Sequence, residues 1–440
     1  MDEEQTVITE EEFELVAQLR EQPDLNGSVR EILAIAKHEG WDANEVEQKL
    51  IVALRELGRV TVGTWASEKA GRLEEEMERV EPCLHRHKQK TVKWLCTFGA
   101  VEISDCVWRD PGGGLHRPLP ERIGVCSRGK SLRLQRALTD FGADESFAKA
   151  SAKVKEHYGL DVGAGAVRAV TLKHAALAQS RERECGGRAF RALPGDGADT
   201  LVCQADGSFL RTVESGLPRK GNRPRQWKEA RVVAAQAAGK ARAVYAATFG
   251  GPEQAGRDWA RAARLAGWAL NTKIHGLGDG ADWIERQLRE IFGENAEYLI
   301  DYYHLLEYLA AAAGRIAPGK EKNWMRTQKR RLRKGQHKKV VSALKKGLEP
   351  ESSPDEEAPA RCAWRYMTNR PDAFNYHKAL EKELPIGSGM IESSHGHILQ
   401  SRMKQNGMAW TLENAEPMVQ LRVLRANDRW PSYWCSQAAA

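Results

Sequence analysis

Residues 200–210 read TLVCQADGSFL, a short apolar run that closes on Asp206 and Gly207. An apolar run of this length that ends at a turn residue predicts a buried strand. Two more short apolar runs follow, EARVVAAQ at 229–236 and RAVYAATF at 242–249. Because turn or basic residues separate the three runs, they predict three consecutive strands.

The pattern then alternates between helix and strand. Residues 253–268 (EQAGRDWARAARLAGW) and 281–293 (ADWIERQLREIFG) have apolar residues at helical spacing, whereas 271–280 (NTKIHGLGDG) and 296–306 (AEYLIDYYHLL) read as strands. Three strands, then helix, strand, helix and strand, predict an antiparallel meander extended by parallel crossover units. We therefore expect an α/β fold with a ribonuclease H-like mixed sheet.

Residues 310–384 carry no strand signal and predict an all-α insertion into this sheet domain. Between Lys320 and Lys346 there are twelve Lys or Arg residues and one acid, Glu321. Such a run is commonly a solvated charged face. Aromatic residues in and after it make contact with nucleic-acid phosphate an equal alternative, and the candidates for that contact are Arg330, Arg331, Arg333 and Lys334.

Three smaller regions are expected before the sheet. Residues 1–80 have helical periodicity, and 81–128 alternate in short runs that predict a small β-rich region. Residues 129–198 include two helical patterns separated near Gly159, the spacing of a helix-turn-helix, followed by a linker. A recognition helix would direct Arg168, Thr171 and Lys173 toward a major groove, but an ordinary helical hairpin fits the same pattern. The sheet domain would then occupy 199–440.

Composition narrows the function classes. The 440 residues carry a formal net charge of +7, so a polyanionic partner is plausible, and no apolar run approaches the length that spans a bilayer. With its acidic start, MDEEQTVITEEEF, the chain is expected in the cytoplasm. Its eight cysteines include no C-x-x-C pair. The set Cys83, His85, His87, Cys96 and Cys106 contains zinc-ligand types without close pairs, so zinc is not expected.

Acidic residues fall where the predicted strands end. Asp206 and Asp279 each precede a glycine, and the ends of the first and fourth strands of such a sheet are neighbours. A third acid, Glu392, lies in GSGMIESSHGHILQSRM at 387–403, a helical pattern with Ser388 as its candidate N-cap. We expect this helix to bring Glu392 to the two aspartates, with Gly396 permitting close approach.

Three carboxylates held together repel one another and need positive charge. Mg²⁺ or Mn²⁺ supplies it, and two such ions can stabilise both the attacking and the leaving oxygen of a phosphoryl displacement. Taken singly, each acid also fits a plain turn or an exposed helix position. Asp301 and His304, placed by this pattern on the fifth strand, are either further metal ligands or a buried, mutually hydrogen-bonded pair.

The motifs CQADGSFL, GLGDGADWI, YLIDYYHLLEYL, IGSGMIESSHGHILQSRMKQNGMAW and LRVLRANDRW resemble those of bacterial insertion-sequence DDE transposases of the ISKra type, which are related to Mutator-like transposases. The resemblance covers about 199–440 and extends more weakly to about 80. It implies that Asp206, Asp279 and Glu392 are the catalytic acids and that Asp301 and His304 form the D-x-x-H signature. It also implies cleavage at element ends, followed by attack of the freed 3′-hydroxyl on target DNA.

One departure from that family concerns its paired cysteines. Relatives often carry C-x-x-C pairs before the helix-turn-helix, whereas Cys83 and Cys106 have no close cysteine partner here. The region 81–128 therefore resembles a degenerate zinc ribbon. This leaves open a host-adopted or inactive DNA-binding protein, and a ribonuclease H-like nuclease without strand transfer is the other alternative.

The expected partners are double-stranded DNA, as terminal inverted repeats and as target, and a second copy of the chain, since pairing two ends needs at least a dimer. No membrane partner is expected, and the protein would associate with the bacterial nucleoid. On the glutamate helix and after it, His395, Arg402, Lys404 and Trp410 are candidates for DNA contact, and structural roles fit them equally well.

Overall fold

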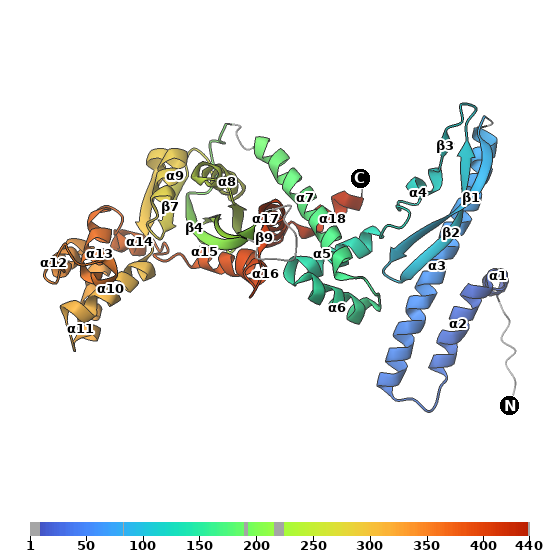
Figure 1. Cartoon of the computed structure of the whole chain (residues 1–440), viewed down its shortest axis with the longest axis horizontal. Coiled ribbons are helices and arrows are strands. Elements are labelled where there is room, and N and C mark those ends of the chain that lie inside the picture. Colours follow the sequence, from blue (N-terminus) through green and yellow to red (C-terminus); the bar gives the residue numbers. More distant parts are fainter. Residues whose placement is uncertain (1–8, 82, 189–191, 215–223, 439–440) are drawn as a thin grey trace. The chain divides into compact units, whose positions relative to one another are not determined.

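The computed structural model describes residues 9–81, 83–188, 192–214 and 224–438. The chain divides into two compact units, Met1–Thr171 and Leu172–Ala440, and Figure 1 labels their elements. Of the residues expected to form the linker, 189–191 lie outside the described part. Among the described residues, we found no helix with the length and apolar character needed to cross a membrane.

The first unit begins with the expected helices, α1 (Glu10–Glu21), α2 (Pro23–Ala36) and α3 (Ala43–Val80). Asp42 starts α3 with a capping box, in which its side chain accepts from the Glu45 amide and Glu45 bonds back to the Asp42 amide. The apolar face expected on α1 is not buried, because α1 contains no buried residue and Phe13 is 69% exposed.

The predicted hairpin follows as β1 (His85–Cys96) and β2 (Gly99–Arg109), an antiparallel pair joined by the short β3 (Leu115–His116) and followed by α4 (Pro118–Arg122). Buried residues of the hairpin, among them Trp94 and Val101, form one core with α3. The hairpin prediction is confirmed.

Three helices complete this region: α5 (Leu132–Asp144), α6 (Phe147–Tyr158) and α7 (Ala164–Arg188). As predicted, α6 stops at Gly159, which has a φ of +68° that favours glycine. The prediction that Thr171 faces DNA is wrong, because Thr171 is 0% exposed and its hydroxyl donates to the Leu138 carbonyl. Arg168 and Lys173 are exposed.

The second unit is built on a mixed sheet in the order β6-β5-β4-β7-β8. β4 pairs with β5 and β5 with β6 antiparallel, whereas β4–β7 and β7–β8 are parallel. The mixed α/β prediction is confirmed. The strand bounds are β4 (Thr200–Val213), β5 (Arg225–Ala237), β6 (Ala243–Thr248), β7 (Lys273–Gly278) and β8 (Ala296–Ile300).

The crossover helices are α8 (Pro252–Leu265) and α9 (Asp282–Phe292), as predicted. Trp259 of α8 and Leu288 of α9 are completely buried in the core beside the sheet. The last strand is shorter than predicted. It ends at Ile300, and Asp301 is the N-cap of α10 (Tyr302–Ile316), so the segment Asp301–His304 lies at a helix start and not on a strand.

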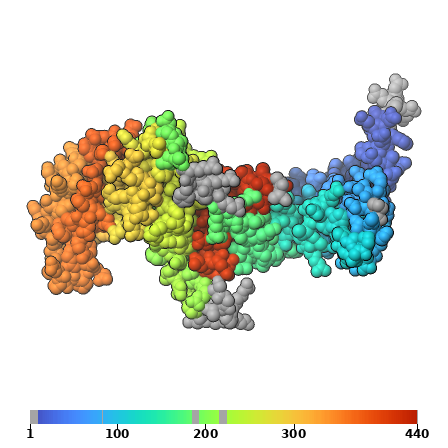
Figure 2. Space-filling view, turned by 90° about the horizontal axis from the view of Figure 1, so that it is seen from above, coloured from blue at the N-terminus to red at the C-terminus, as the bar shows by residue number. Residues whose placement is uncertain are grey.

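The predicted all-α insertion is confirmed. After the 3₁₀ turn η1 (Gly293–Asn295), which precedes β8, and after α10, it comprises α11 (Glu321–Arg333), α12 (His337–Lys345), η2 (Asp355–Glu357), α13 (Pro359–Thr368) and α14 (Tyr376–Glu381). These helices, orange in Figure 2, lie against the yellow segment that holds β7 and α9. Buried residues from α10 to α14 join the core of the sheet.

The glutamate segment forms α15 (Gly389–Ser394), a π-helical turn η3 (His395–Gln400) and α16 (Ser401–Met403). A short strand, β9 (Trp410–Thr411), then pairs in parallel with the far end of β4. The chain finishes with α17 (Leu412–Ala426) and α18 (Trp430–Ala438). The predicted helix around Glu392 is therefore present, but a π turn interrupts it.

Candidate active site

One pocket of about 220 Å³ is lined by the three acids that the sequence singled out, Asp206, Asp279 and Glu392. They come from the middle of β4, the turn after β7 and the helix α15. The remaining lining residues include Asp301, His304 and Glu307 from the start of α10. The structure thus brings together the catalytic candidates and the D-x-x-H pair. We call this the acid pocket.

The strand register explains why the two aspartates meet. In the parallel pair of β4 and β7, Gln204 lies opposite Leu277. Asp206 and Asp279 each follow two residues later, so they reach the same level at neighbouring positions. Gly280, with a φ of +91°, forms the turn after Asp279. Asp279 Oδ1 accepts from the Ala281 amide at 2.8 Å, which fixes this carboxylate on the turn.

Gln204 attaches the third acid to the sheet. It is 2% exposed, its Oε1 accepts from the Ile391 amide at 3.0 Å, and its Nε2 donates to the Gly387 carbonyl at 3.3 Å. These bonds hold the start of α15 over β4, one residue before Glu392. Sequence reasoning missed this role, although a glutamine inside an apolar strand is a buried polar group that must find partners.

The acids interact electrostatically. Burial raises the pKa of Asp206 to about 6, and the negative charges of Asp279 and Glu392 raise it further, against a lowering contribution from His304. The Gly207 amide donates to Asp206 Oδ1 at 2.7 Å and also opposes the rise. Asp206 is therefore a carboxylate that gains from added positive charge.

Asp301 has a different environment from the other acids. It is 2% exposed, and its Oδ1 accepts from the amides of Tyr303 and His304 at 2.6 and 3.1 Å. Its Oδ2 accepts from the amide of Ser388 at 2.6 Å and from the Ser388 hydroxyl. Asp301 is thus a buried cap that joins α10 to the start of α15. Its partner in His304 is the backbone, whereas the His304 ring lies 3.4 Å from Glu307.

Two expectations about the glutamate helix are corrected. Ser388 is the N-cap residue of α15, but its hydroxyl bonds to Asp301 instead of capping the helix. Gly396 is not required for close approach, because a Cβ added there meets nothing within 4 Å. The segment widens instead through the π turn, where the Ser401 amide bonds to the Gly396 carbonyl.

Two nitrogen-bearing side chains lie beside Asp206. His395 is 4% exposed and its Nδ1 is 3.7 Å from Asp206 Oδ2. Burial lowers the pKa of His395 to about 4, so the ring is neutral at pH 7. Lys404 donates to the Ser208 hydroxyl, two residues along β4 from Asp206. Burial lowers the pKa of Lys404, and the Asp206 charge opposes that shift.

Arg402 does not lie where a DNA-contacting residue is expected. It is 1% exposed, and its guanidinium carbon lies over the Trp410 ring, 4.9 Å from the centroid. Trp410 is itself 6% exposed. The pair belongs to the packing between α16 and β9, so direct phosphate contact by either residue is not supported.

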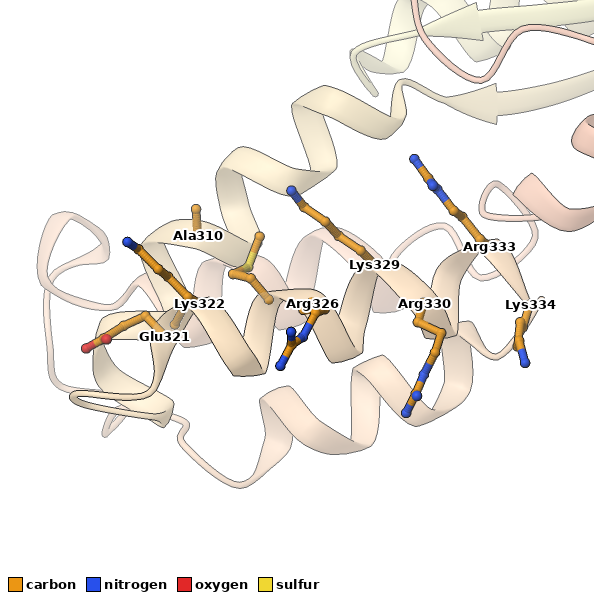
Figure 3. Close-up of a pocket in the computed structure, with 10 residues that line it drawn as sticks. Ala310, Glu321, Lys322, Arg326, Lys329, Arg330, Arg333 and Lys334 are labelled. Atoms are coloured by element: carbon orange, nitrogen blue, oxygen red, sulfur yellow. The ribbon is translucent and has the colours of Figure 1, made fainter.

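A second, larger pocket of about 820 Å³ lies on the insertion. Six basic residues of α11 and the turn after it line this pocket, together with Glu321, Met325 and two alanines of α10, Ala310 and Ala313. The basic residues are Lys322, Arg326, Lys329, Arg330, Arg333 and Lys334. Figure 3 shows them spaced along the whole helix. We call this the basic groove.

Three of the four predicted insertion contacts, Arg330, Arg333 and Lys334, line the basic groove. Arg331 does not. Its guanidinium donates to Gln328 Oε1 at 3.1 Å and reaches the Lys339 carbonyl at 3.5 Å, so it connects α11 to α12. Equal charges on neighbouring residues therefore have different surroundings.

The chemistry of the acid pocket fits a hard divalent cation, since its donors are carboxylate oxygens whose mutual repulsion raises the pKa of Asp206. Asp206, Asp279 and Glu392 would hold the ions. Across the described residues, the side chains do not form a group of three or more His, Cys, Asp or Glu already placed to hold a metal ion. In the 81–128 region, Cys83 is exposed, whereas Cys96 and Cys106 are buried in the hairpin.

Comparison with known proteins gives a partial match. The family described as "Uncharacterised protein family (UPF0236)" matches residues 268–430, which include Asp279, Asp301, His304 and Glu392 but not Asp206. UPF0236 protein TTE0402 of Caldanaerobacter subterraneus subsp. tengcongensis is 28% identical over 158 residues, which are 35% of this chain and 30% of that protein. UPF0236 protein TTE1650/TTE2708 of the same organism is 26% identical over 155 residues, 35% of this chain and 30% of that protein. The chain spans about a third of the length of these relatives.

Proposed function

We propose that this protein is a DDE-type DNA transposase. It would cleave the ends of an insertion sequence and join the freed 3′-hydroxyl groups to target DNA, with Asp206, Asp279 and Glu392 as the catalytic acids. The observation that carries the proposal is that these three residues, contributed by three separate elements, line one pocket. Asp206 and Asp279 are 73 residues apart in the sequence, and Glu392 is a further 113 residues along.

The finer fold assignment, a ribonuclease H-like domain, is part of this proposal. Its support is the strand order β6-β5-β4-β7-β8, in which an antiparallel meander is extended by two parallel strands. An all-α insertion between the last strand and the glutamate helix also agrees with the family that the sequence resembles. Asp206 and Asp279 lie where the parallel pairing of β4 and β7 ends, the position where open α/β sheets commonly carry ligands.

Two Mg²⁺ or Mn²⁺ ions, when bound, would activate water and stabilise the charge that develops on the phosphate during displacement. The protein's own residues supply position. The register of β4 and β7 aligns the two aspartates, and Gln204 holds α15 so that Glu392 reaches the same pocket. The Asp301 cap fixes the first turn of α10, which forms the opposite wall.

In the proposed cleavage, water attacks the phosphorus atom, the P–O3′ bond breaks and the 3′-hydroxyl leaves. In joining, that hydroxyl attacks a target phosphate and releases a new 3′-hydroxyl, so the number of phosphodiester bonds is conserved. Neither step requires a covalent protein nucleophile. Double-stranded DNA is the proposed substrate. A homodimer or a larger assembly on two ends, in a nucleoid-associated cytoplasmic protein, completes the proposal.

The first experiment uses a labelled duplex that carries the inverted repeat found beside the coding region. We expect Mg²⁺-dependent nicking by the wild-type chain and none by Asp206→Asn. A protein that binds the duplex without any metal-dependent product would be a DNA-binding derivative and not a transposase. A second assay supplies pre-cut ends and target DNA, because a nuclease without strand transfer would nick the first duplex and join nothing in the second.

A further inference from the structure

The basic groove has the charge and dimensions of a binding surface for a nucleic-acid backbone. Its six cations face one acid, Glu321. The helix that carries most of them, α11, has 13 residues, so it is about 20 Å long at 1.5 Å per residue. That length equals roughly six base-pair steps of B-form DNA. All six basic residues are exposed.

The basic residues form two rows along α11. Figure 3 shows Lys322, Lys329 and Arg333 directed to one side, and Arg326, Arg330 and Lys334 directed to the other. Between the rows, the small side chains Ala310 and Ala313 of α10 leave room. Two rows of cations with an uncharged floor match a chain of phosphates better than a single bound anion.

One face of α10 connects the groove to the acid pocket. Tyr303 and Glu307 line the acid pocket, and Ala310 lines the groove. These residues are spaced i, i+4 and i+7, so they lie on the same side of the helix. Seven residues of helix span about 10 Å, or roughly three base-pair steps. At the near end of the groove, the Arg333 guanidinium lies 5.6 Å from the ring centroid of Tyr302, next to Asp301.

We infer that the α10–α11 groove holds the phosphodiester backbone of the substrate DNA next to the bond that is cleaved in the acid pocket. This inference rests on the function proposed above. It adds a location and a reach: the contacted phosphates begin roughly three base pairs from the cleaved bond and extend to roughly nine. The alternative is that these lysines and arginines form only a solvated face.

The test measures binding of a labelled end duplex across a salt series without Mg²⁺, so that no cleavage occurs. The groove variant is Arg326→Ala/Lys329→Ala/Arg330→Ala. Its control is Lys338→Ala/Lys339→Ala/Lys345→Ala on the neighbouring α12, which removes the same charge from exposed residues outside the groove. We expect the groove variant to lose at least about tenfold in affinity at low salt and to lower the salt slope by about 3, and the control to stay near wild type.

A second measurement locates the contact. Duplexes with uncharged methylphosphonates at positions roughly three to nine from the cleaved bond should weaken wild-type binding and leave the groove variant unaffected. Equal losses in the two triple variants would overturn the inference, and so would a groove defect seen with target DNA alone while end binding is unchanged. A failure of the proposed function is distinguishable, because it appears as absent Mg²⁺-dependent cleavage by the wild-type chain.

Discussion

The acid pocket and the basic groove share the helix α10 and differ in almost every other respect. The pocket is small, and its carboxylates raise one another's pKa. The groove is larger, open and lined by cations. A DNA phosphate is repelled by the first surface and attracted by the second. The difference suggests a division of work, in which the groove supplies affinity for DNA and the pocket, once charged with cations, supplies chemistry.

The largest effect should come from an acid of the pocket. We expect Asp279→Asn to reduce Mg²⁺-dependent cleavage about 10³-fold or more while DNA affinity changes little, because the affinity comes from the groove. Cleavage rates and affinities measured on the same end duplex test this. Glu307→Gln is the control, since its carboxylate lines the same pocket but is 76% exposed. A comparable loss in the control would break the comparison.

A second variant separates structural from catalytic acids within the pocket. Asp301→Ala should lower the free energy of unfolding by about 3 kcal/mol, because it leaves the amides of Tyr303, His304 and Ser388 without their acceptor. Urea denaturation with and without Mg²⁺ is the measurement. Ser388→Ala should cost about 1 kcal/mol. If Asp301→Ala destabilised the chain only in the presence of Mg²⁺, Asp301 would be a metal ligand instead of a cap.

The third prediction uses pH, to which the pocket should respond and the groove should not. The pKa of Asp206 is about 6 in the folded chain against an ordinary value of 3.8. Between these values the folded state binds more protons than the unfolded state, so this contribution to stability is lost as pH rises from about 4 to 6.

Asp206→Asn should remove that pH dependence and, above pH 6 without metal, stabilise the chain by about 2 kcal/mol. Unfolding curves of both proteins from pH 4 to pH 8 test this. Mg²⁺ should reverse the order, because it stabilises the wild-type chain more than the variant. Parallel pH profiles of wild type and variant would contradict the electrostatic account of the pocket.

The smallest effect compares two adjacent arginines. Arg330→Ala should weaken DNA binding about threefold and lower the salt slope by about 1, whereas Arg331→Ala should leave the slope unchanged. The reason is position, since Arg330 lines the groove and Arg331 bonds to Gln328 and Lys339. Identical slopes for the two variants would mean that the groove does not discriminate between its own cations and neighbouring ones.

The sequence was informative where local pattern and tertiary demand agree. The apolar runs of β4 and β7 end in Asp-Gly, so both the strands and the placement of Asp206 and Asp279 could be predicted. The end of β8 could not be seen in periodicity, because AEYLIDYYHLL remains apolar across the change from strand to helix. Asp301 itself was the available signal, as an aspartate is a preferred N-cap.

Other features depend on contacts between distant segments. Arg402 looks like a surface cation by residue type, and only its packing on Trp410 shows that it is buried. Thr171 has the spacing of a recognition residue but bonds to α5. The run of basic residues on α11 was evident in the sequence, whereas the alanine floor that makes it a groove comes from α10.

The π turn at His395–Gln400 also constrains how this chain can change. A turn closed by a bond from residue i+5 to residue i accommodates one more residue than an α-helical turn. Removing a single residue from that turn would let the segment relax to an α-helix and rotate everything after it by about 100° relative to Glu392. Lys404 would then leave Ser208 and Arg402 would leave Trp410. Point substitutions should therefore be accommodated here far more readily than deletions or insertions.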